Sequence, residues 1–510
     1  MSVFKTLFSA AVIVVSVLSV SGCRNTGVAL KKIDKDKYYR AAIGGQEYFF
    51  RLDSLGGKKS KGHYYAVSEA PVAPRHDFEM GISRKKVTLE TCGNRSRIRM
   101  SDITVSLYTE PEFSAEDTTL FRIPLRGVKT TSDIEFGTAE GYWTSLQGVE
   151  AEVSKVFTEG FIRSFKRRNL KLTLDLYQPD DLTGTRPLIM FIHGGAFYVG
   201  DKSEPAFVDF CEHFASLGYV TASINYRLGF HAGKGAIERA AYCALQDANA
   251  AMRFLTANAG KYGIDTGEIY VAGSSAGSIT ALNLAYMKDE DRPESTYGGR
   301  KQRARKDLGD IDEAGNEIRG NFRIRAVANM WGAISSMEMI RNGHADIISF
   351  HGDADEVVPY GEGYPFAMAG KLISQTLSEK MFGSACIDSA ARSAGLRSEM
   401  YTFAGEGHAL NTSGKDKKTN DFHTFIKDRM KDFFYTEMVP HEAEIIPDGN
   451  GRYHLSTNVG SLKWKAEGGF FLKDGKDAIV LWRADEPQRT ISASGKYGNG
   501  IGYETSLTNQ

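Results

Sequence analysis

Residues 273–277 read Gly-Ser-Ser-Ala-Gly and place two adjacent serines between glycines. The apolar stretch IYVA precedes them, and an apolar run typical of a helix follows. A G-x-S-x-G sequence in a strand-to-helix turn lifts its central serine onto a sharp bend, where the hydroxyl can attack a carbonyl carbon. The positions of the glycines select Ser275, because Ser274 has no glycine two residues before it. We therefore predict that Ser275 is a nucleophile.

A serine hydroxyl reacts efficiently only when a neighbouring base takes its proton, and histidine exchanges protons near neutral pH. His408 lies in the segment FAGEGHAL, after an apolar strand, where Gly405 and Gly407 leave the loop free to aim the ring. Five other histidines follow Ser275 in the chain. His344 and His351 lie before or at the start of the acid-bearing segment described next, and we expect His423 at the surface of a helix. His441 and His454 belong to the C-terminal segment. We therefore predict His408 as the general base.

The third member of such a group is a carboxylate that accepts a hydrogen bond from the histidine and fixes its tautomer. The segment DIISFHGDADEVVPY offers Asp353, Asp355 and Glu356 directly after an apolar strand. It resembles the pattern H-G-x-x-D-x-x-V-P of hydrolases, in which Asp355 has the acid position. We therefore predict Asp355 as the acid, with Asp353 as the alternative.

Acyl transfer also needs hydrogen-bond donors for the oxyanion that forms on the carbonyl group. The segment FIHGGAFYVG ends an apolar strand and resembles the HGGG-type loop of esterases, with Ala196 in place of the third glycine. The resemblance assigns the donors to the backbone N–H groups of Gly195, Ala196 and Ala276. We expect His193 to orient this loop and not to act as a base.

The motifs HGGAF, GSSAG, HGDADEVVP and GEGHA occur in the order found in the α/β-hydrolase family, and residues from about 151 to 436 resemble its carboxylesterase-like members. The resemblance implies a triad of Ser275, His408 and Asp355 that hydrolyses carboxylic esters through an acyl-enzyme, without a metal or an organic cofactor. Two alternatives stay open. One is a serine peptidase or amidase of the same fold, and the other is a catalytically inactive surface lipoprotein that binds glycans.

The elements that must position these residues alternate along the chain. Five apolar strands, LIMFIHG, YVTASINYR, IYVAG, IRAVANMWG and DIISFHG, are separated by stretches with helical periodicity. This alternation predicts an α/β fold with a mostly parallel sheet and helices on both faces. Short strand-like stretches flank it, and the Trp464…Trp482 spacing resembles Ig-like or PKD-like modules. We expect a β-rich domain over 23–150, a catalytic domain over 151–438 and a β-sandwich module over 439–510.

Residues 1–22 have the features of a signal peptide: a basic start, then the apolar stretch TLFSAAVIVVSVLSVSG before Cys23. Val20-Ser21-Gly22-Cys23 resembles the lipobox of bacterial lipoproteins, in which the cysteine is lipidated, and a plain secretory signal is the alternative. We expect a lipid-anchored protein of the bacterial cell envelope, in the outer membrane and facing the periplasm or the cell surface. That location and the β modules suggest small or polysaccharide-linked esters as substrates.

Composition narrows the choice of partners and cofactors. The chain has 510 residues, with 63 basic and 63 acidic side chains and a formal net charge of zero, so nothing favours nucleic acid as a partner. Its five cysteines are Cys23, Cys92, Cys211, Cys243 and Cys386, and their spacing is not that of metal ligands. Cys211 and Cys243 could form a disulfide in an oxidising envelope, or they could be buried thiols.

Residues 288–322 separate the nucleophile helix from the next strand and are crowded with charges. Each CH₂ moved from water into an apolar groove gains about 0.8 kcal/mol, so an enzyme for long acyl chains needs an apolar cover. This segment contains no apolar helix that could supply one. We therefore expect a preference for short acyl groups or compact aromatic ones.

We predict that Cys23→Ser moves the protein from the membrane fraction to the soluble fraction without abolishing hydrolysis. Several acyl chains on one cysteine anchor a protein stably, and this cysteine is far in sequence from the residues predicted to react. Fractionation of cells that express each form, with an ester assay on both fractions, checks this. Retention of the variant in the membranes would mean that another anchor exists.

Overall fold

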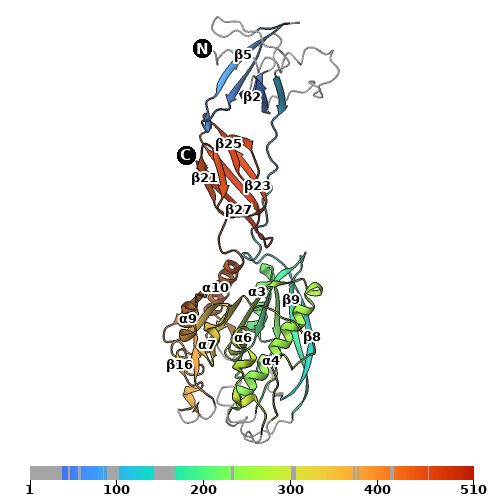
Figure 1. Ribbon diagram of the computed structural model, residues 1–510, viewed down its shortest axis with the longest axis vertical. Helices are drawn as coiled ribbons and strands as arrows, with labels where there is room; N and C mark the ends of the chain where they lie inside the picture. Colours follow the sequence, from blue (N-terminus) through green and yellow to red (C-terminus); the bar gives the residue numbers. More distant parts are fainter. Residues whose placement is uncertain are drawn as a thin grey trace. The chain divides into compact units, whose positions relative to one another are not determined.

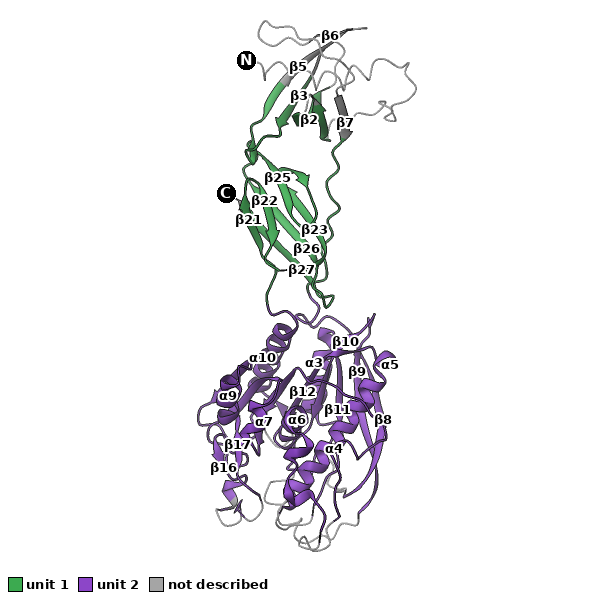
Figure 2. Cartoon of the chain, in the orientation of Figure 1, with its two compact units in different colours: residues 1–118, 441–510 green, residues 119–440 purple. Residues whose placement is uncertain are grey.

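The computed structural model describes residues 37–43, 46–54, 59–83, 86–88, 103–142, 167–230, 235–299, 306–370, 374–375, 378–413, 418–457 and 459–509. The chain forms two compact units (Figure 2). Residues 119–440, which contain the four motifs, are called the α/β unit below. Residues 1–118 and 441–510 together are called the β unit.

An eight-stranded sheet forms the centre of the α/β unit (Figure 1). In spatial order its strands are β18 (Ser398–Phe403), β15 (Asp346–Gly352), β13 (Ala326–Met330), β12 (Ile264–Ser274), β10 (Arg186–Ile192), β11 (Val220–Ile224), β9 (Arg168–Pro179) and β8 (Val128–Gly141). The strands from β18 to β11 run parallel, whereas β9 pairs antiparallel with both β11 and β8. The five apolar strands predicted from the sequence all lie inside this sheet.

Helices cover both faces of the sheet. They are α3 (Pro205–Leu217), α4 (Ala236–Ala257), α5 (Ala259–Tyr262), α6 (Ala276–Tyr286), α7 (Met337–Arg341), α9 (Ser384–Ser393) and α10 (Asp421–Met438). Alternate residues of a strand point to opposite faces. Thus Met190 and Ile192 of β10 pack in the core that includes α4 and α6, whereas Phe191 stacks on Phe210 of α3 with 5.6 Å between the ring centroids. The predicted fold class, a mostly parallel sheet with helices on both faces as in α/β hydrolases, is confirmed.

The α/β unit begins earlier in the chain than the sequence predicted. The expected boundary between residues 150 and 151 lies outside the described residues, within 143–166. Before it, β8 pairs with β9 along its length and so belongs to the α/β sheet. Most side chains of β8 are exposed or half-buried, because it is an edge strand. Its polar sequence therefore resembles the strands before it more than the apolar sheet that it joins.

The β unit contains strands from both ends of the chain. One sheet has the order β6 (Lys86–Thr88), β5 (His76–Ser83), β3 (Lys59–Ala66), β2 (Gln46–Ser54), β1 (Tyr39–Ile43) and β7 (Ile103–Leu107). The C-terminal residues form two more sheets. One has the order β21 (Ile445–Gly449), β22 (Arg452–Leu455), β25 (Ala478–Arg483) and β24 (Gly469–Lys473). The other has the order β23 (Gly460–Glu467), β26 (Arg489–Lys496) and β27 (Gly502–Asn509).

The two parts of the β unit share contacts, although the sequence predicted separate domains. The short strand β4 (Val72–Ala73) pairs in parallel with β25. Phe49 stacks on Phe470 with 4.4 Å between the ring centroids, and the Tyr65 hydroxyl donates to the Asp485 carboxylate at 2.9 Å. These contacts bury aromatic side chains of one part against the other, so the two parts form one compact unit.

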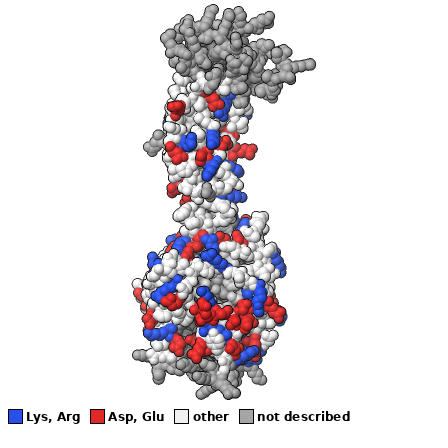
Figure 3. Space-filling view, viewed as in Figure 1, with Lys and Arg blue, Asp and Glu red and all other residues white. Residues whose placement is uncertain are grey.

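Residues 1–36, with the predicted signal and Cys23, lie outside the described residues, as does Cys92. Within the described part, Cys211, Cys243 and Cys386 are free, so the possible Cys211–Cys243 disulfide is not formed. None of the described helices has the length and apolar character needed to cross a membrane. Figure 3 shows basic and acidic side chains close to one another on the face drawn, in keeping with the net charge of zero.

Candidate active site

The predicted site residues come from loops at one edge of the α/β sheet. In the parallel pairings Ile192 of β10 lies opposite Gly273 of β12, and Gly352 of β15 lies opposite Phe403 of β18. Strand β13 pairs with both β12 and β15. The loops that follow these strands therefore leave the sheet together at its carboxyl edge, where open α/β sheets bind their ligands.

Ser275 occupies a strained turn between β12 and α6. Its backbone has φ 54° and ψ −121°, a combination that residues other than glycine rarely adopt. A Cβ atom on Gly273 would lie 2.3 Å from the carbonyl oxygen of Gly277, and a Cβ atom on Gly277 would lie 2.0 Å from that of Ile192. The two glycines therefore let strand and helix meet backbone to backbone. Ser274, the last residue of β12, is not on this turn.

The structure brings Ser275, His408 and Asp355 together in one hydrogen-bonded chain. His408 Nε2 lies 2.9 Å from Ser275 Oγ, and His408 Nδ1 lies 2.6 Å from Asp355 Oδ2. A carboxylate can only accept, so Nδ1 carries a proton toward Asp355 and Nε2 is left to accept the serine proton. The three residues therefore have the mutual geometry of a nucleophile, its base and the acid that orients the base.

The side chain of Asp355 is fully buried, yet its surroundings stabilise the negative charge. Its Oδ1 accepts hydrogen bonds from the backbone N–H groups of Val357 (2.7 Å) and Val358 (3.0 Å). Its Oδ2 accepts from His408 and also from Nε2 of His351, at 3.1 Å. Burial opposes ionisation, but these hydrogen bonds outweigh it and hold the pKa of the Asp355 carboxyl well below its usual range. The side chain is therefore a carboxylate at neutral pH.

The neighbouring candidates have other contacts. Asp353, the alternative acid, is exposed and accepts a hydrogen bond from the backbone N–H of Gly405 at 2.7 Å, which ties the acid loop to the histidine loop. Glu356 is exposed. The expectation that His423 lies at the surface is wrong. It is buried with its Nε2 2.7 Å from Asp209 Oδ2, because α10 packs against α3 at this point.

The predicted oxyanion loop has a backbone that favours glycine. Gly195 and Ala196 have φ angles of 110° and 53°. Ala196 occupies the position of the third glycine of the HGGG-type loop, and glycine adopts a positive φ at little cost. Ala196 and Ala276 line the same cavity as Ser275, whereas Gly195 is not among the lining residues. The structure thus brings two of the three predicted donor residues to the cavity.

His193 and Tyr226 hold this loop in place. The Tyr226 hydroxyl donates to the carbonyl oxygens of His193 (2.8 Å) and Gly194 (3.2 Å), and the rings of His193 and Tyr226 stack with 4.5 Å between centroids. His193 Nδ1 donates to the Gly194 carbonyl at 2.8 Å. Burial lowers the pKa of the His193 imidazole, so this ring is neutral and supports the loop as a packed side chain.

A chain of buried hydrogen bonds behind Asp355 was not predicted from the sequence. His351 of β15 reaches Asp355 through Nε2 and Ser384 Oγ through Nδ1, the second at 2.7 Å. Asn329 of β13 donates from Nδ2 to Ser384 Oγ at 2.9 Å and accepts at Oδ1 from Ser278 Oγ at 2.6 Å. Because Asn329 donates to Ser384, the Ser384 hydroxyl proton is free to point at His351 Nδ1, which leaves Nε2–H for Asp355. The chain ends on α6, since Ser278 belongs to that helix.

The sequence placed His351 only at the start of the acid loop and gave it no role. The histidine of the H-G-x-x-D pattern was the one available signal for it. Its partners Asn329 and Ser384 are common polar residues far away in the sequence, and only the pairing of the strands brings them together.

An apolar cavity of about 90 Å³ lies beside Ser275. Ile279 and Asn283 line it from one side of α6, four and eight residues after the serine, and Met287, the residue after the helix, also lines it. Other lining residues come from α4 and from the loop after β15, among them Ile237, Ala241, Tyr242, Leu245, Val357, Val358, Pro365 and Phe366. Helices α4 and α6 thus supply apolar side chains beside the serine, and of the described residues of 288–322 only Pro293 lines the cavity. The expected preference for short acyl groups stays a prediction.

Comparison with known proteins finds similarity in this part of the chain. Residues 174–334 match the family model described as BD-FAE. The para-nitrobenzyl esterase of Bacillus subtilis (strain 168) is 31% identical over 120 residues, which cover 23% of this chain and 24% of that protein. Phenmedipham hydrolase of Pseudarthrobacter oxydans is 36% identical over 118 residues, 22% of this chain and 23% of that protein. The chain thus spans less than a quarter of the length of these curated relatives.

Among solved structures, Thermogutta terrifontis esterase 2 with propionate bound aligns with a TM-score of 0.38 at 23% identity, over 53% of this chain and 90% of that one.

The BD-FAE match contains the HGGAF and GSSAG motifs and ends before Asp355 and His408. Together with the curated relatives, it confirms the predicted resemblance to carboxylesterase-like α/β hydrolases.

We predict that His351→Phe lowers kcat by about 10- to 100-fold, because loss of a hydrogen bond to a charged group, worth about 1.5–3 kcal/mol, leaves Asp355 less firmly held in line with His408. With one donor fewer, the Asp355 carboxylate accepts more strongly from His408 and favours its protonated form. The acid limb of the kcat/KM profile should therefore move to higher pH. His351→Gln, whose amide N–H can replace the donor, should recover part of both effects. A lower rate with an unmoved acid limb would reduce His351 to a packing residue.

Proposed function

Starting from the carboxylesterase-like character of residues 174–334, we propose that this protein is a serine ester hydrolase with Ser275, His408 and Asp355 as its triad. One observation carries the proposal: the hydrogen-bonded chain from Ser275 Oγ through His408 to Asp355 Oδ2, at 2.9 and 2.6 Å, beside an apolar cavity. A serine on a strained turn, with base and acid at these distances, has what acyl transfer requires.

In the first half of the reaction, Ser275 Oγ attacks the ester carbonyl carbon while its proton passes to His408 Nε2. The carbonyl π electrons move to the oxygen, and the backbone N–H groups of Ala196 and Ala276 stabilise the resulting oxyanion, with Gly195 as the third donor implied by the motif. The Asp355 carboxylate stabilises the imidazolium. Collapse of the intermediate breaks the C–O bond, and the alcohol leaves with the proton from His408.

In the second half, water takes the place of the alcohol. His408 accepts a proton from the water as its oxygen attacks the acyl-enzyme carbonyl, and the same donors hold the second oxyanion. Release of the carboxylic acid returns the proton to Ser275 Oγ. The reaction as written uses groups of the chain, the ester and one water molecule.

The cavity favours a short acyl group. Its volume of about 90 Å³ is smaller than the ~150 Å³ of a cavity that takes up benzene. Two residues of the lining, Asn283 and Ser378, each have a side-chain oxygen that is buried without a hydrogen-bond partner. An alkyl chain cannot pair with either oxygen, whereas a polar substituent with a donor hydrogen could, and a hydrogen bond of this kind contributes about 0.5–1.5 kcal/mol. The cavity therefore suits an acetyl or butyryl group, or a compact acyl group with a polar substituent.

We propose further that Cys23 is lipidated and holds the enzyme in the bacterial envelope. The support is the resemblance of residues 20–23 to a lipobox. In that setting, acyl esters on polysaccharides are a reasonable substrate class, and the β unit is a candidate for carbohydrate contact. The HGGAF loop favours this ester hydrolase over a peptidase or amidase, and the assembled triad argues against an inactive glycan-binding protein.

We predict that Ser275→Ala lowers the hydrolysis of p-nitrophenyl acetate on the order of a millionfold, because a triad nucleophile and its base act as a unit. Ser274→Ala, the matched control on the neighbouring residue, should keep most of the activity, since Ser274 lies on β12 before the turn. Initial rates of purified proteins with matched melting temperatures check this. Comparable losses from both substitutions would contradict the assignment of Ser275.

We predict that kcat/KM on p-nitrophenyl esters from two to twelve carbons is highest at four carbons or fewer. Asn283→Leu should move the preference toward longer chains, because it replaces an unpaired amide oxygen by an apolar group.

Release of acetate from acetylated xylan, measured with the same preparation, tests the polysaccharide proposal. A maximum at eight carbons or more would contradict the short-acyl proposal, and activity confined to aryl esters would contradict the polysaccharide one.

A further inference from the structure

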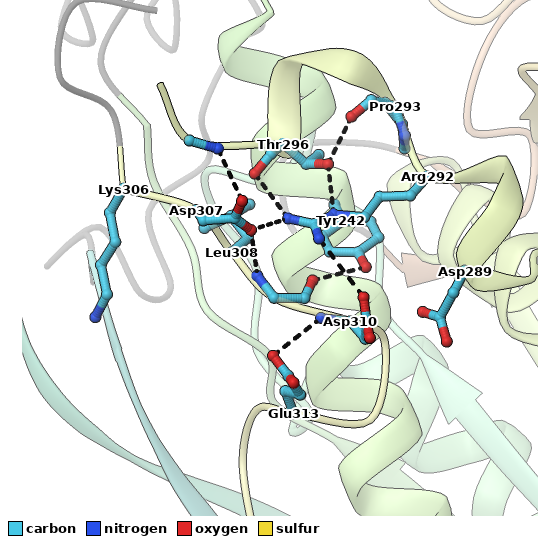
Figure 4. Close-up of polar contacts among 12 residues, drawn as sticks. Tyr242, Asp289, Arg292, Pro293, Thr296, Lys306, Asp307, Leu308, Asp310 and Glu313 are labelled. Carbon is cyan, nitrogen blue, oxygen red and sulfur yellow. Dashed lines mark hydrogen bonds and ion pairs between the residues drawn. The ribbon is translucent and has the colours of Figure 1, made fainter. Parts of the chain in front are cut away.

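Arg292 is a buried cation in the segment that follows α6, with a side chain only 4% exposed. Its Nε and Nη2 donate to the hydroxyl and the carbonyl oxygen of Thr296, each at 3.0 Å. The guanidinium also pairs with Asp307 and, at 3.6 Å, with Asp310 (Figure 4). It lies 4.1 Å from the ring centroid of Tyr297. A buried charge is tolerated only when it is paired in this way, so Arg292 has a fixed position.

Asp307 and Leu308 join two stretches of this segment. The two oxygens of Asp307 accept hydrogen bonds from the backbone N–H groups of Gly298 (3.0 Å) and Gly309 (2.9 Å). The backbone N–H of Leu308 donates to the carbonyl oxygen of Thr296 at 3.1 Å. Described residues on either side of 300–305 therefore fold around one guanidinium (Figure 4).

This folded segment is hydrogen-bonded to α4. The Tyr242 hydroxyl donates to the Gly309 carbonyl at 3.0 Å, and Gln246 Nε2 donates to the carbonyl oxygens of Leu308 (2.8 Å) and Asp310 (3.0 Å). The guanidinium of Arg292 lies 5.4 Å from the ring centroid of Tyr242. Tyr242 is therefore held by the segment at its hydroxyl and at its ring.

Tyr242 is also part of the cavity beside Ser275, and so is Pro293, the residue after Arg292. One side of the cavity therefore depends on a side chain that packs against Arg292 and on the backbone that continues from it. Loss of the guanidinium would leave Asp307 without its cation and a void next to Tyr242. Both changes free this side of the cavity to move outward.

We propose that Arg292 is a specificity-determining positioning residue, which fixes Tyr242 and Pro293 as a wall of the cavity and so limits the length of the acyl group. The inference rests on the proposed ester hydrolysis and adds to it the residue that sets the size of the substrate. The contacts of Arg292 described above are with the wall and with its own segment. The hydrogen bonds of the triad are made by other residues.

The test compares kcat and KM on p-nitrophenyl acetate and octanoate. Arg292→Ala should raise the octanoate-to-acetate ratio of kcat/KM by about tenfold, the scale on which a pocket discriminates small changes in apolar size. The change should come from a lower KM for octanoate, with kcat on acetate unchanged. Asp307→Asn removes the partner charge at nearly constant shape and should shift the ratio in the same direction by less.

Arg319→Ala is the matched control, because Arg319 lies in the same segment but is 58% exposed and contacts Asp312. Its ratio should equal that of the wild type. If Arg292→Ala does not fold, as judged by its thermal transition, Asp307→Asn decides the question. An unmoved ratio in the folded variants, with an active wild type, would overturn this inference alone. A wild type inactive on every ester would overturn the proposed function and the inference together.

Discussion

The site depends on the backbone contact between β10 and the N-terminus of α6. A Cβ atom on Gly277 would lie 2.0 Å and 2.4 Å from the carbonyl oxygens of Ile192 and His193, so only glycine fits there. This contact holds Ser275 on its strained turn, a conformation that costs on the order of 1–3 kcal/mol and lasts only where the surrounding structure enforces it. It also fixes Ser275 relative to the loop that begins at His193. One close approach thus positions the proposed nucleophile and the proposed oxyanion donors together.

A second constraint is the cost of burying the charge of Asp355. A carboxylate removed from water needs hydrogen-bond donors, and here they come from its own loop, from His408 and from His351. His351 depends in turn on Ser384 and Asn329, and Asn329 also contacts α6. The geometry of the proposed triad therefore depends on the whole carboxyl edge of the sheet. Substitution of any residue in this network should therefore alter the position or the hydrogen bonds of the Asp355 carboxylate.

Much of the site could be predicted because its residues belong to short local motifs. The glycines around Ser275, the place of Asp355 after an apolar strand and the glycines before His408 are each visible within ten residues. The apolar strands were visible for the same reason, since a strand buried on both faces reads as a continuous apolar run. The conformation of Ala196 explains why the related loop has glycine at that position.

The features that were missed depend on contacts between distant segments. The edge strand β8 is polar, and only its pairing with β9 shows that it belongs to the α/β sheet. His423 is buried because α10 meets α3, and the cavity beside Ser275 is apolar because α4, α6 and the loop after β15 each contribute a few residues. Residues 288–322 read as a charged surface loop because the buried ion pair of Arg292 cannot be distinguished, in sequence, from exposed charges.

Reaction of the purified protein with a fluorophosphonate probe, followed by mass spectrometry of the peptides, tests without a choice of ester substrate whether Ser275 is a nucleophile activated by His408 and Asp355. We expect one phosphonyl adduct, on Ser275, that forms quickly at neutral pH and much more slowly when His408 is replaced by alanine. An adduct on Ser274 or elsewhere, or an intact protein that does not react, would rule out this role for Ser275.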